Sequence, residues 1–280
     1  MGDAAGRPLT MVSGQTVRVE RLDDGVHHLV LARPAARNAL DAAMIAELAN
    51  ALDTLATMPE PELRLVVLRG EGDTLCSGAD LGYMRGQGGQ GRETNRADAD
   101  LLPGVFRRLA AMPVPVVGVL RGAAMGGGLG LVACCDFVIA EDTAVVALPE
   151  VRLGLLPAVI GPYLLRKIGL SHTQALAFSG RRHTAEEAQR MGLVHQVVTP
   201  GDLPLSLAKV VAELLRGGPQ AMRRTKHLYL QLSPLPSAMV ETLTAATIAE
   251  ARASDEARAG IEAFLARQRA PWVPEERKKS

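Results

Sequence analysis

Residues 122–136 read Gly-Ala-Ala-Met-Gly-Gly-Gly-Leu-Gly-Leu-Val-Ala-Cys-Cys-Asp, with the glycine run Gly126–Gly128 at their centre. The apolar run Val116–Leu120 before them predicts a strand, and Leu129–Cys134 after them predicts a helix. Glycines let a ligand approach the backbone closely, and the start of a helix offers free N–H groups to an anion. The junction therefore suits a phosphate or an oxyanion, although tight packing of a helix on a strand would also explain the glycines.

The glycine cluster does not match the common nucleotide-binding motifs. A dinucleotide site requires Gly-x-Gly-x-x-Gly, and a phosphate-binding loop requires Gly-Lys-Ser/Thr after its glycines. Neither pattern occurs in residues 122–136, so the cluster is not assigned to a nucleotide.

Strand and helix patterns alternate on both sides of this cluster. Val17–Glu20 and His28–Leu31 predict two strands, separated by an Asp-Asp-Gly turn. The order of the patterns indicates an α/β fold with mostly parallel strands. The further elements that we expect are helices over Ala42–Thr57 and Asp98–Met112 and strands over Leu63–Arg69 and Asp136–Ala140.

From Leu205 onward the strand patterns stop, and amphipathic helical patterns follow at Ser206–Arg216, Pro236–Ala253 and Asp255–Ala270. We therefore expect a core over residues 15–204 and a helical C-terminal region over residues 205–280. Residues 1–15 are expected to be a loose leader.

Bulk composition excludes several classes of function. Hydrophobic residues make up 48% of the 280 residues, enough for a large core, and the net charge of +1 gives no electrostatic reason to bind nucleic acid or an anionic membrane. The longest apolar stretch, 114–135, is interrupted by Pro115, Arg121 and glycines, unlike a membrane span. No secretory signal is recognisable, and the three cysteines lack metal-ligand spacing. We expect Cys76, Cys134 and Cys135 to be reduced and buried in a cytoplasmic protein without a metal.

A second junction of strand and turn carries Cys76-Ser-Gly-Ala-Asp-Leu81. It follows the strand predicted at Leu63–Arg69, much as the glycine cluster follows Val116–Leu120. Each junction could therefore point one N–H group at a shared point, which is the geometry of an oxyanion hole. A simple turn with a hydrogen bond to the aspartate would explain the same residues.

Glu150, in Leu148-Pro-Glu-Val151, is the carboxylate best placed for chemistry, because it follows a strand-like segment and precedes an apolar run. Apolar neighbours would raise its pKa and suit it to proton transfer. A helix cap or a surface position is the alternative. The histidines are scattered, and the patterns His-Glu-x-x-His and Gly-x-Ser-x-Gly, which mark a zinc site and a nucleophile elbow, are absent.

Taken in order, these segments resemble the enoyl-CoA hydratase/isomerase family, also called the crotonase family. The resemblance runs from about Val17 to Trp272 and includes bacterial members of the methylglutaconyl-CoA hydratase type. The segments that carry it are Arg33–Asp41, Cys76–Leu81, Gly122–Asp136, Leu148–Pro157, Gly180–Val198 and Gly260–Arg267.

This resemblance implies a spiral of ββα units, followed by a helical region that assembles homotrimers or homohexamers. It implies an acyl-CoA thioester as substrate and no separate cofactor, because coenzyme A arrives as part of the substrate. By the same resemblance, the N–H groups of Ala79 and Gly127 polarise the thioester carbonyl, and Glu150 moves protons. The residues expected along the substrate are Arg37, Ala39, Ser77, Asp80, Leu81, Gly82, Gly126, Gly130 and Pro149.

One position departs from the hydratases of that family, which commonly use two glutamates. Glu150 matches the later one, but the earlier one is replaced by Gly130. Loss of one acid–base group slows a reaction by about 10²–10⁴-fold. Hydration of a 2-enoyl-CoA is the leading hypothesis, with a branched or carboxylated acyl group using the space at Gly130. Isomerisation or decarboxylation by one carboxylate, and a non-catalytic acyl-CoA-binding protein, are the alternatives.

Overall fold

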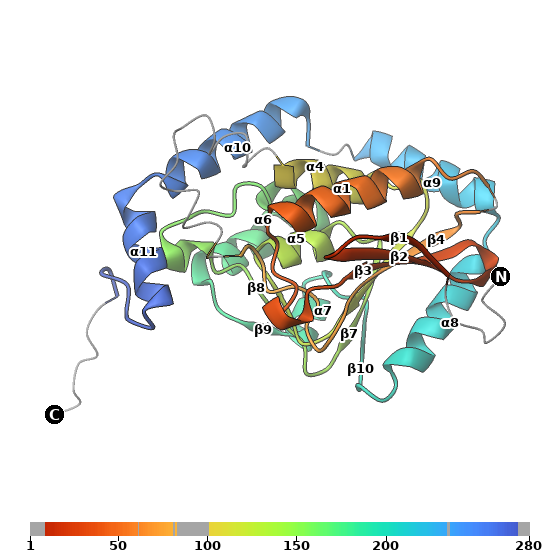
Figure 1. Cartoon of the computed structure of the whole chain (residues 1–280), viewed down its shortest axis with the longest axis horizontal. Coiled ribbons are helices and arrows are strands. Elements are labelled where there is room, and N and C mark those ends of the chain that lie inside the picture. The colour runs from red at the N-terminus through yellow and green to blue at the C-terminus, as the bar shows by residue number, and fades with distance from the viewer. Residues whose placement is uncertain (1–8, 61, 81, 83–100, 234–235, 274–280) are drawn as a thin grey trace.

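The computed structural model describes residues 9–60, 62–80, 82, 101–233 and 236–273. Two sheets lie at its centre (Figure 1). The larger has the order β1 (Leu9–Ser13), β2 (Val17–Arg21), β3 (Val26–Leu31), β4 (Leu65–Gly70), β5 (Val116–Leu120), β7 (Phe137–Glu141) and β10 (Gln196–Val198). The smaller has the order β6 (Ala123–Met125), β8 (Val145–Ala147) and β9 (His183–Thr184).

Strand direction in the larger sheet confirms the expected mostly parallel α/β arrangement. From β3 through β4, β5 and β7 to β10 all neighbours are parallel, whereas β1, β2 and β3 form an antiparallel meander. The pairing of β1 with β2 contradicts, for Leu9–Ser13, the prediction of a loose leader over residues 1–15, of which residues 1–8 lie outside the described residues. Main-chain hydrogen bonds to β2 hold Leu9–Ser13 in the sheet, and such bonds require no distinctive side-chain pattern.

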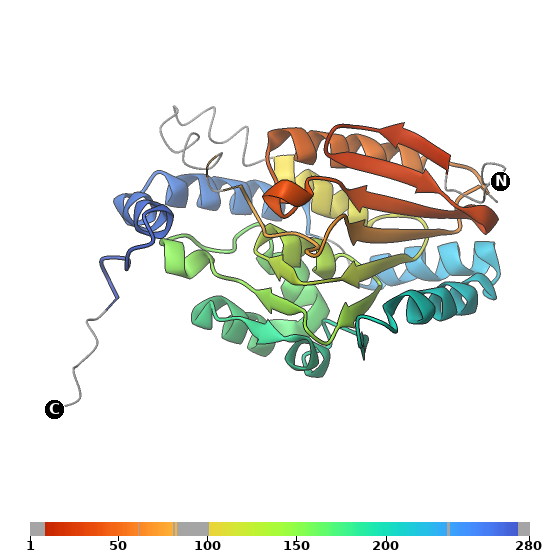
Figure 2. The same ribbon diagram turned by 60° about the horizontal axis from the view of Figure 1, so that its bottom comes forward.

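Helices cover both faces of the larger sheet (Figure 2). On one face, α1 (Ala42–Ala56), α4 (Leu101–Ala110) and α5 (Gly127–Ala133) enclose the main core. On the other face, α8 (Leu203–Leu215) buries Leu203 and Val210 against the sheet. The sequence of α1 explains its place: Asp41 accepts a hydrogen bond from the Met44 N–H at its start, and its apolar residues recur on one face.

Each predicted helix and strand has an observed counterpart close to it, but several observed elements were not predicted. The helix after the glycines begins at Gly127 and not at Leu129, because Gly126 takes the N-cap position with φ 48°. Two long helices, α6 (Gly161–Ser179) and α9 (Pro219–Leu232), have no predicted counterpart. None of the residues of α9 is buried, so it lacks the core-facing apolar stripe that reveals a helix in a sequence.

Helices also make up the C-terminal region, as predicted. After α6 (Gly161–Ser179) and α7 (Ala185–Arg190), the chain forms α8, α9, α10 (Ala238–Arg252) and α11 (Asp255–Leu265). Figure 1 shows α10 and α11 in blue, at the end of the molecule opposite to α8 and α9. In the part of the chain that the structure describes, no helix is long and apolar enough to cross a membrane.

Candidate active site

The two sequence junctions lie side by side. The segment that follows β4 pairs with β6, since the Met125 N–H donates to the Cys76 carbonyl oxygen over 3.1 Å. On its other side the same segment pairs with Leu40, and the Asp80 N–H donates to the Leu40 carbonyl oxygen over 2.9 Å. The smaller sheet therefore continues through residues 76–79 to Leu40 and brings both junctions together.

Two glycines allow this close approach of backbones. Gly78 has φ +94°, and a Cβ at this position would lie 2.7 Å from the Met125 carbonyl oxygen. A Cβ at Gly128 would lie 2.5 Å from the Cys76 carbonyl oxygen. Any larger residue would push the junctions apart, so the need for glycine here is structural as well as chemical.

Ala79 and Gly127 both line one cavity of about 580 Å³. Gly127 is the first residue of α5, so its N–H has no acceptor within the helix. Within the described residues, no hydrogen bond from the Ala79 N–H is found either. Two backbone donors on one cavity wall, one of them at the positive end of a helix, can stabilise an oxyanion.

Among the described residues that line the cavity, Glu150 is the only one with a carboxyl side chain. It is the first residue of the short 3-10 helix η3 (Glu150–Leu153), which follows β8. A Cβ built on Gly126 would lie 2.9 Å from Glu150 Oε1, so the carboxylate sits directly beside the start of α5. Its Oε2 is buried and has no hydrogen-bond partner among the described residues. Burial raises the pKa of Glu150 to about 7, so near neutral pH it can both accept and donate a proton.

The other predicted substrate residues divide into two groups, of which only one borders the cavity. Arg37, Ser77, Gly126 and Pro149 line it, whereas Ala39, Asp80, Gly82 and Gly130 are not among its lining residues. Leu81 lies outside the described residues.

Ala39 and Asp80 share a neighbour, Arg33. Its Nη1 donates to the Ala39 carbonyl oxygen over 2.7 Å, and its Nη2 lies 3.5 Å from Asp80 Oδ2. These contacts hold the loop that carries Arg37 against the segment that carries Ala79.

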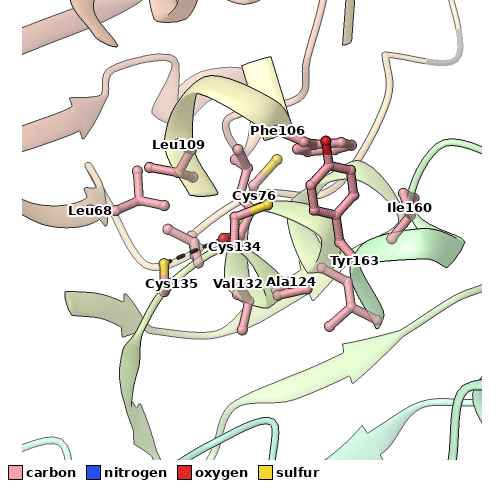
Figure 3. Close-up of a cluster of buried hydrophobic side chains, with 14 of the residues drawn as sticks. Leu68, Cys76, Phe106, Leu109, Ala124, Val132, Cys134, Cys135, Ile160 and Tyr163 are labelled. Carbon is pink, nitrogen blue, oxygen red and sulfur yellow. Dashed lines mark hydrogen bonds between the residues drawn. The ribbon is translucent and has the colours of Figure 1, made fainter. Parts of the chain in front are cut away.

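Gly130 does not leave open space, contrary to our expectation. A Cβ at this position would lie 2.5 Å from Cζ of Phe106, whose ring is fully buried. Figure 3 shows Phe106 packed beside Tyr163, with the ring centroids 5.6 Å apart. The helix α4 has filled the volume that a side chain at position 130 would need, so a branched acyl group cannot use it.

Sequence reasoning missed the part of the cavity wall that comes from distant helices. Leu102 comes from α4, Ile248 and Arg252 from α10, and Phe264 from α11. Arg152 and Arg182 were not selected either, although both border the cavity. Ile248, Arg252 and Phe264 belong to no local motif that points to the site, and the packing of the C-terminal helices on the core brings them there. Among the described residues, no cluster of side chains suited to a metal ion occurs.

A family model described as enoyl-CoA hydratase/isomerase matches residues 21–275. The chain belongs to the enoyl-CoA hydratase/isomerase family. Relatives support this assignment over most of their length. The chain is 33% identical over 246 residues to the 2,3-dehydroadipyl-CoA hydratase of Escherichia coli, covering 85% of this chain and 91% of that protein. It is 32% identical over 247 residues to the crotonyl-CoA hydratase of Syntrophomonas wolfei, covering 88% and 93%.

The fold agrees with this family membership. A crystal structure of an enoyl-CoA hydratase from Mycobacterium avium superimposes with a TM-score of 0.80 at 28% identity, covering 93% of this chain and all of that one. The molecule therefore has the crotonase fold with a helical C-terminal region, and it is an enzyme of the enoyl-CoA hydratase/isomerase family that acts on acyl-CoA thioesters.

Proposed function

We propose that this enzyme adds water to a 2-enoyl-CoA thioester, with Glu150 as the acid–base residue. One observation carries the proposal: the Glu150 carboxylate, with its Oε2 buried, lies directly beside the start of α5, in the same cavity as the Ala79 and Gly127 N–H groups. A proton-transfer group and two oxyanion donors thus face one bound thioester.

The backbone donors would hold the thioester oxygen as negative charge develops on it. Water attacks C3 of the 2-enoyl group, and the C2–C3 double bond shifts its electron pair into the thioester, giving an enolate. Two fixed N–H groups stabilise this enolate without reorganisation, and one such donor is typically worth about 3–4 kcal/mol. The donors would come from Ala79 and Gly127.

Glu150 can carry both proton transfers. As a carboxylate it takes a proton from the attacking water while the C3–O bond forms. As the resulting carboxylic acid it gives that proton to C2 when the enolate collapses, which restores the carboxylate. The pKa of about 7 means that neither protonation state of Glu150 is strongly disfavoured near neutral pH.

The cavity favours an acyl group that carries a carboxylate or other polar end. Arg152 and Arg182 lie on its wall, and the Arg182 side chain makes no hydrogen bond or ion pair with the described residues. A guanidinium binds a carboxylate well. Arg37, which also lines the cavity, is assigned to coenzyme A. The relative named 2,3-dehydroadipyl-CoA hydratase makes such a substrate a sensible first choice.

Glu150→Gln tests the proposal. The substitution keeps the size of the side chain but cannot accept the proton of water, so we expect turnover of 2,3-dehydroadipyl-CoA and crotonyl-CoA to fall by about 10²-fold or more. Binding of coenzyme A esters, measured by calorimetry, is expected to stay within about threefold of wild type. A wild-type protein that binds these esters without changing them would instead support a non-catalytic acyl-CoA-binding role.

Isomerisation is the second candidate, because Phe106 occupies the place where a second carboxylate could approach from position 130. Glu150 alone could take a proton from C4 and return it to C2. Mass spectrometry of the product distinguishes these reactions. Hydration adds the mass of water, isomerisation leaves the mass unchanged, and decarboxylation removes carbon dioxide.

We also propose that the enzyme assembles as a homotrimer or homohexamer in the cytoplasm. Support for assembly comes from large apolar side chains that remain exposed on the C-terminal helices, among them Leu232 and Met239. Support for a reducing compartment comes from Cys76, Cys134 and Cys135, which are all buried with free thiols.

A further inference from the structure

Phe106 and Gly130 form a complementary pair behind the cavity. The ring of Phe106 is fully buried, and three of its atoms would lie within 3.0 Å of a Cβ on Gly130. The ring can occupy this place only because residue 130 has no side chain. Packing of this kind is specific to the two residues and is independent of the backbone contacts that hold Gly78 and Gly128.

The pair continues the wall that lines the cavity. Leu102 and Gly127 both line the cavity, and Leu102 Cδ2 would lie 3.7 Å from a Cβ on Gly127. Phe106 follows Leu102 by four residues on α4, and Gly130 follows Gly127 by three residues on α5, so each pair shares a helix face. The Phe106–Gly130 contact is therefore the next layer of the same interface, directly behind the layer that touches the cavity.

We infer that Phe106 is a specificity-determining residue, whose ring fills the space behind the Leu102–Gly127 wall of the cavity and so limits the length of the acyl group that fits there. The inference rests on the proposed function, since it concerns the same site. It goes beyond that function by naming the residue that sets the size of the substrate.

The physical reason lies in the surroundings of the ring. Phe106 packs edge-to-face on Tyr163 at an interplanar angle of 65°, and Leu109 and Cys134 lie in the same buried cluster (Figure 3). Truncation of a buried phenylalanine leaves a cavity that the surroundings fill only in part. A cavity at this place lies one layer behind Leu102 and has apolar walls, so an acyl chain can extend into it.

The experiment compares the binding of saturated acyl-CoA esters, which have no double bond to hydrate. Calorimetry gives the dissociation constants of butyryl-CoA and hexanoyl-CoA for the wild type and for Phe106→Ala. We expect the ratio of hexanoyl to butyryl affinity to rise by about tenfold in the variant, because the longer chain gains apolar contact in the opened space.

Leu109→Ala is the matched control. Leu109 is fully buried on the same helix, so its truncation also costs stability, but the Phe106 ring remains against Gly130. Its affinity ratio is expected to equal that of the wild type. Thermal denaturation shows whether each variant is folded, and Phe106→Leu, with an intermediate shift, replaces Phe106→Ala if the latter does not fold.

An unchanged affinity ratio in a folded Phe106→Ala or Phe106→Leu protein would overturn the inference, and so would an equal change in Leu109→Ala. The proposed function is tested by a different measurement, the conversion of 2-enoyl-CoA by the wild type. If the wild type converts no 2-enoyl-CoA but the affinity ratio changes as expected, the proposed reaction is wrong and the role of Phe106 stands.

Discussion

The carboxyl group of Glu150 lies in surroundings that oppose its charge. Burial raises its pKa to about 7, although its own backbone N–H acts in the opposite direction, and its Oε2 has no hydrogen-bond partner among the described residues. A buried, unpaired carboxylate is costly to a folded protein. In this protein the same burial that destabilises the fold gives Glu150 the pKa that the proposed proton transfers need near neutral pH.

This cost predicts how Glu150→Gln changes stability with pH. The pKa in the folded protein lies above the ordinary value of 4.5, so the folded state holds the proton more tightly and stability falls as pH rises from 4.5 to about 7. The full difference corresponds to at most about 3 kcal/mol. We expect the glutamine variant to be more stable than the wild type at pH 8, by about 1–3 kcal/mol, with a much smaller difference at pH 4.

Chemical denaturation of both proteins at the two pH values measures this effect. Glu213→Gln is a suitable control, because Glu213 is an exposed surface residue in α8. A stability difference that is the same at pH 4 and pH 8 would show that Glu150 carries no buried charge in the folded protein.

At the residue scale, the sequence predicts what local motifs encode. Strand ends in the sequence point to Glu150 and to the two junctions, and the family resemblance singles out Ala79 and Gly127 within these junctions. The structure brings all three residues to one cavity. The sequence gives no reason to select Phe106 as a site residue. Its proposed role depends on a contact with Gly130, which lies on a different helix. A sequence shows that a side chain is absent at position 130, but not which neighbour has taken the space.

At the element scale, α11 supports the short helix that carries Glu150. Gly154 ends η3 with φ +69°, and a Cβ there would lie 2.7 Å from the Glu256 backbone in α11. A Cβ on Gly260 would lie 2.5 Å from the Leu153 carbonyl oxygen. The two elements therefore touch backbone to backbone, and the position of Glu150 depends on how closely α11 approaches.

Gly260→Ala is expected to weaken this contact. The added methyl group must push α11 away from η3, which costs about 1–3 kcal/mol and lets water approach Glu150. Because burial is what raises the Glu150 pKa, the midpoint of the rise of kcat/KM with pH should move from about 7 toward the ordinary value of 4.5.

The pH profile of each variant tests this effect. Gly161→Ala makes the same chemical change at a helical glycine that has no atom within 4 Å of the added methyl group, so its profile should match the wild type. An unmoved midpoint in Gly260→Ala, together with a lowered melting temperature, would mean that α11 stabilises the fold but does not tune Glu150.

Most helices with a buried apolar face were predicted, although α6 was not. The helix α9 shows why a helix without such a face escapes prediction. Cations attach it to the core: Arg223 Nη2 donates to the Leu63 carbonyl oxygen over 2.9 Å, and Lys226 Nζ donates to the Val114 carbonyl oxygen over 2.9 Å. Its apolar residues face outward, with Leu232 72% exposed. Hydrophobic periodicity identifies helices that turn an apolar face to the core. A helix that contacts the core through charged side chains is therefore not recognised by this pattern.

At the scale of the whole molecule, the exposed apolar side chains of α9 and of the neighbouring helix in the chain, α10, remain uncovered. Tyr229 and Leu232 on α9 and Met239 and Leu243 on α10 are all exposed. Large apolar side chains that are exposed in this way are expected to be covered by another subunit. The position of α9 and α10 at the periphery, clear of the cavity walls apart from Ile248 and Arg252, leaves this surface free for assembly.

The double variant Leu232→Glu/Met239→Glu should therefore dissociate the proposed homotrimer. Burying a leucine or methionine side chain contributes about 1.5–3 kcal/mol, and a buried unpaired carboxylate opposes assembly further. Analytical ultracentrifugation is expected to show trimers or hexamers for the wild type and monomers for the variant. Leu205→Glu, at an exposed position on α8, is the control and should assemble normally. A monomeric wild type would rule out the assembly.

The contact between Phe106 and Gly130 also constrains how this sequence can change. An acidic side chain at position 130 meets the aromatic ring at 2.5 Å from its first carbon, so it cannot be introduced while the ring is in place. A smaller residue at position 106 leaves Gly130 unobstructed and can come first. An evolutionary path, or a directed-evolution library, that leads to a two-carboxylate site therefore has a required order, and screening single substitutions at position 130 would miss it.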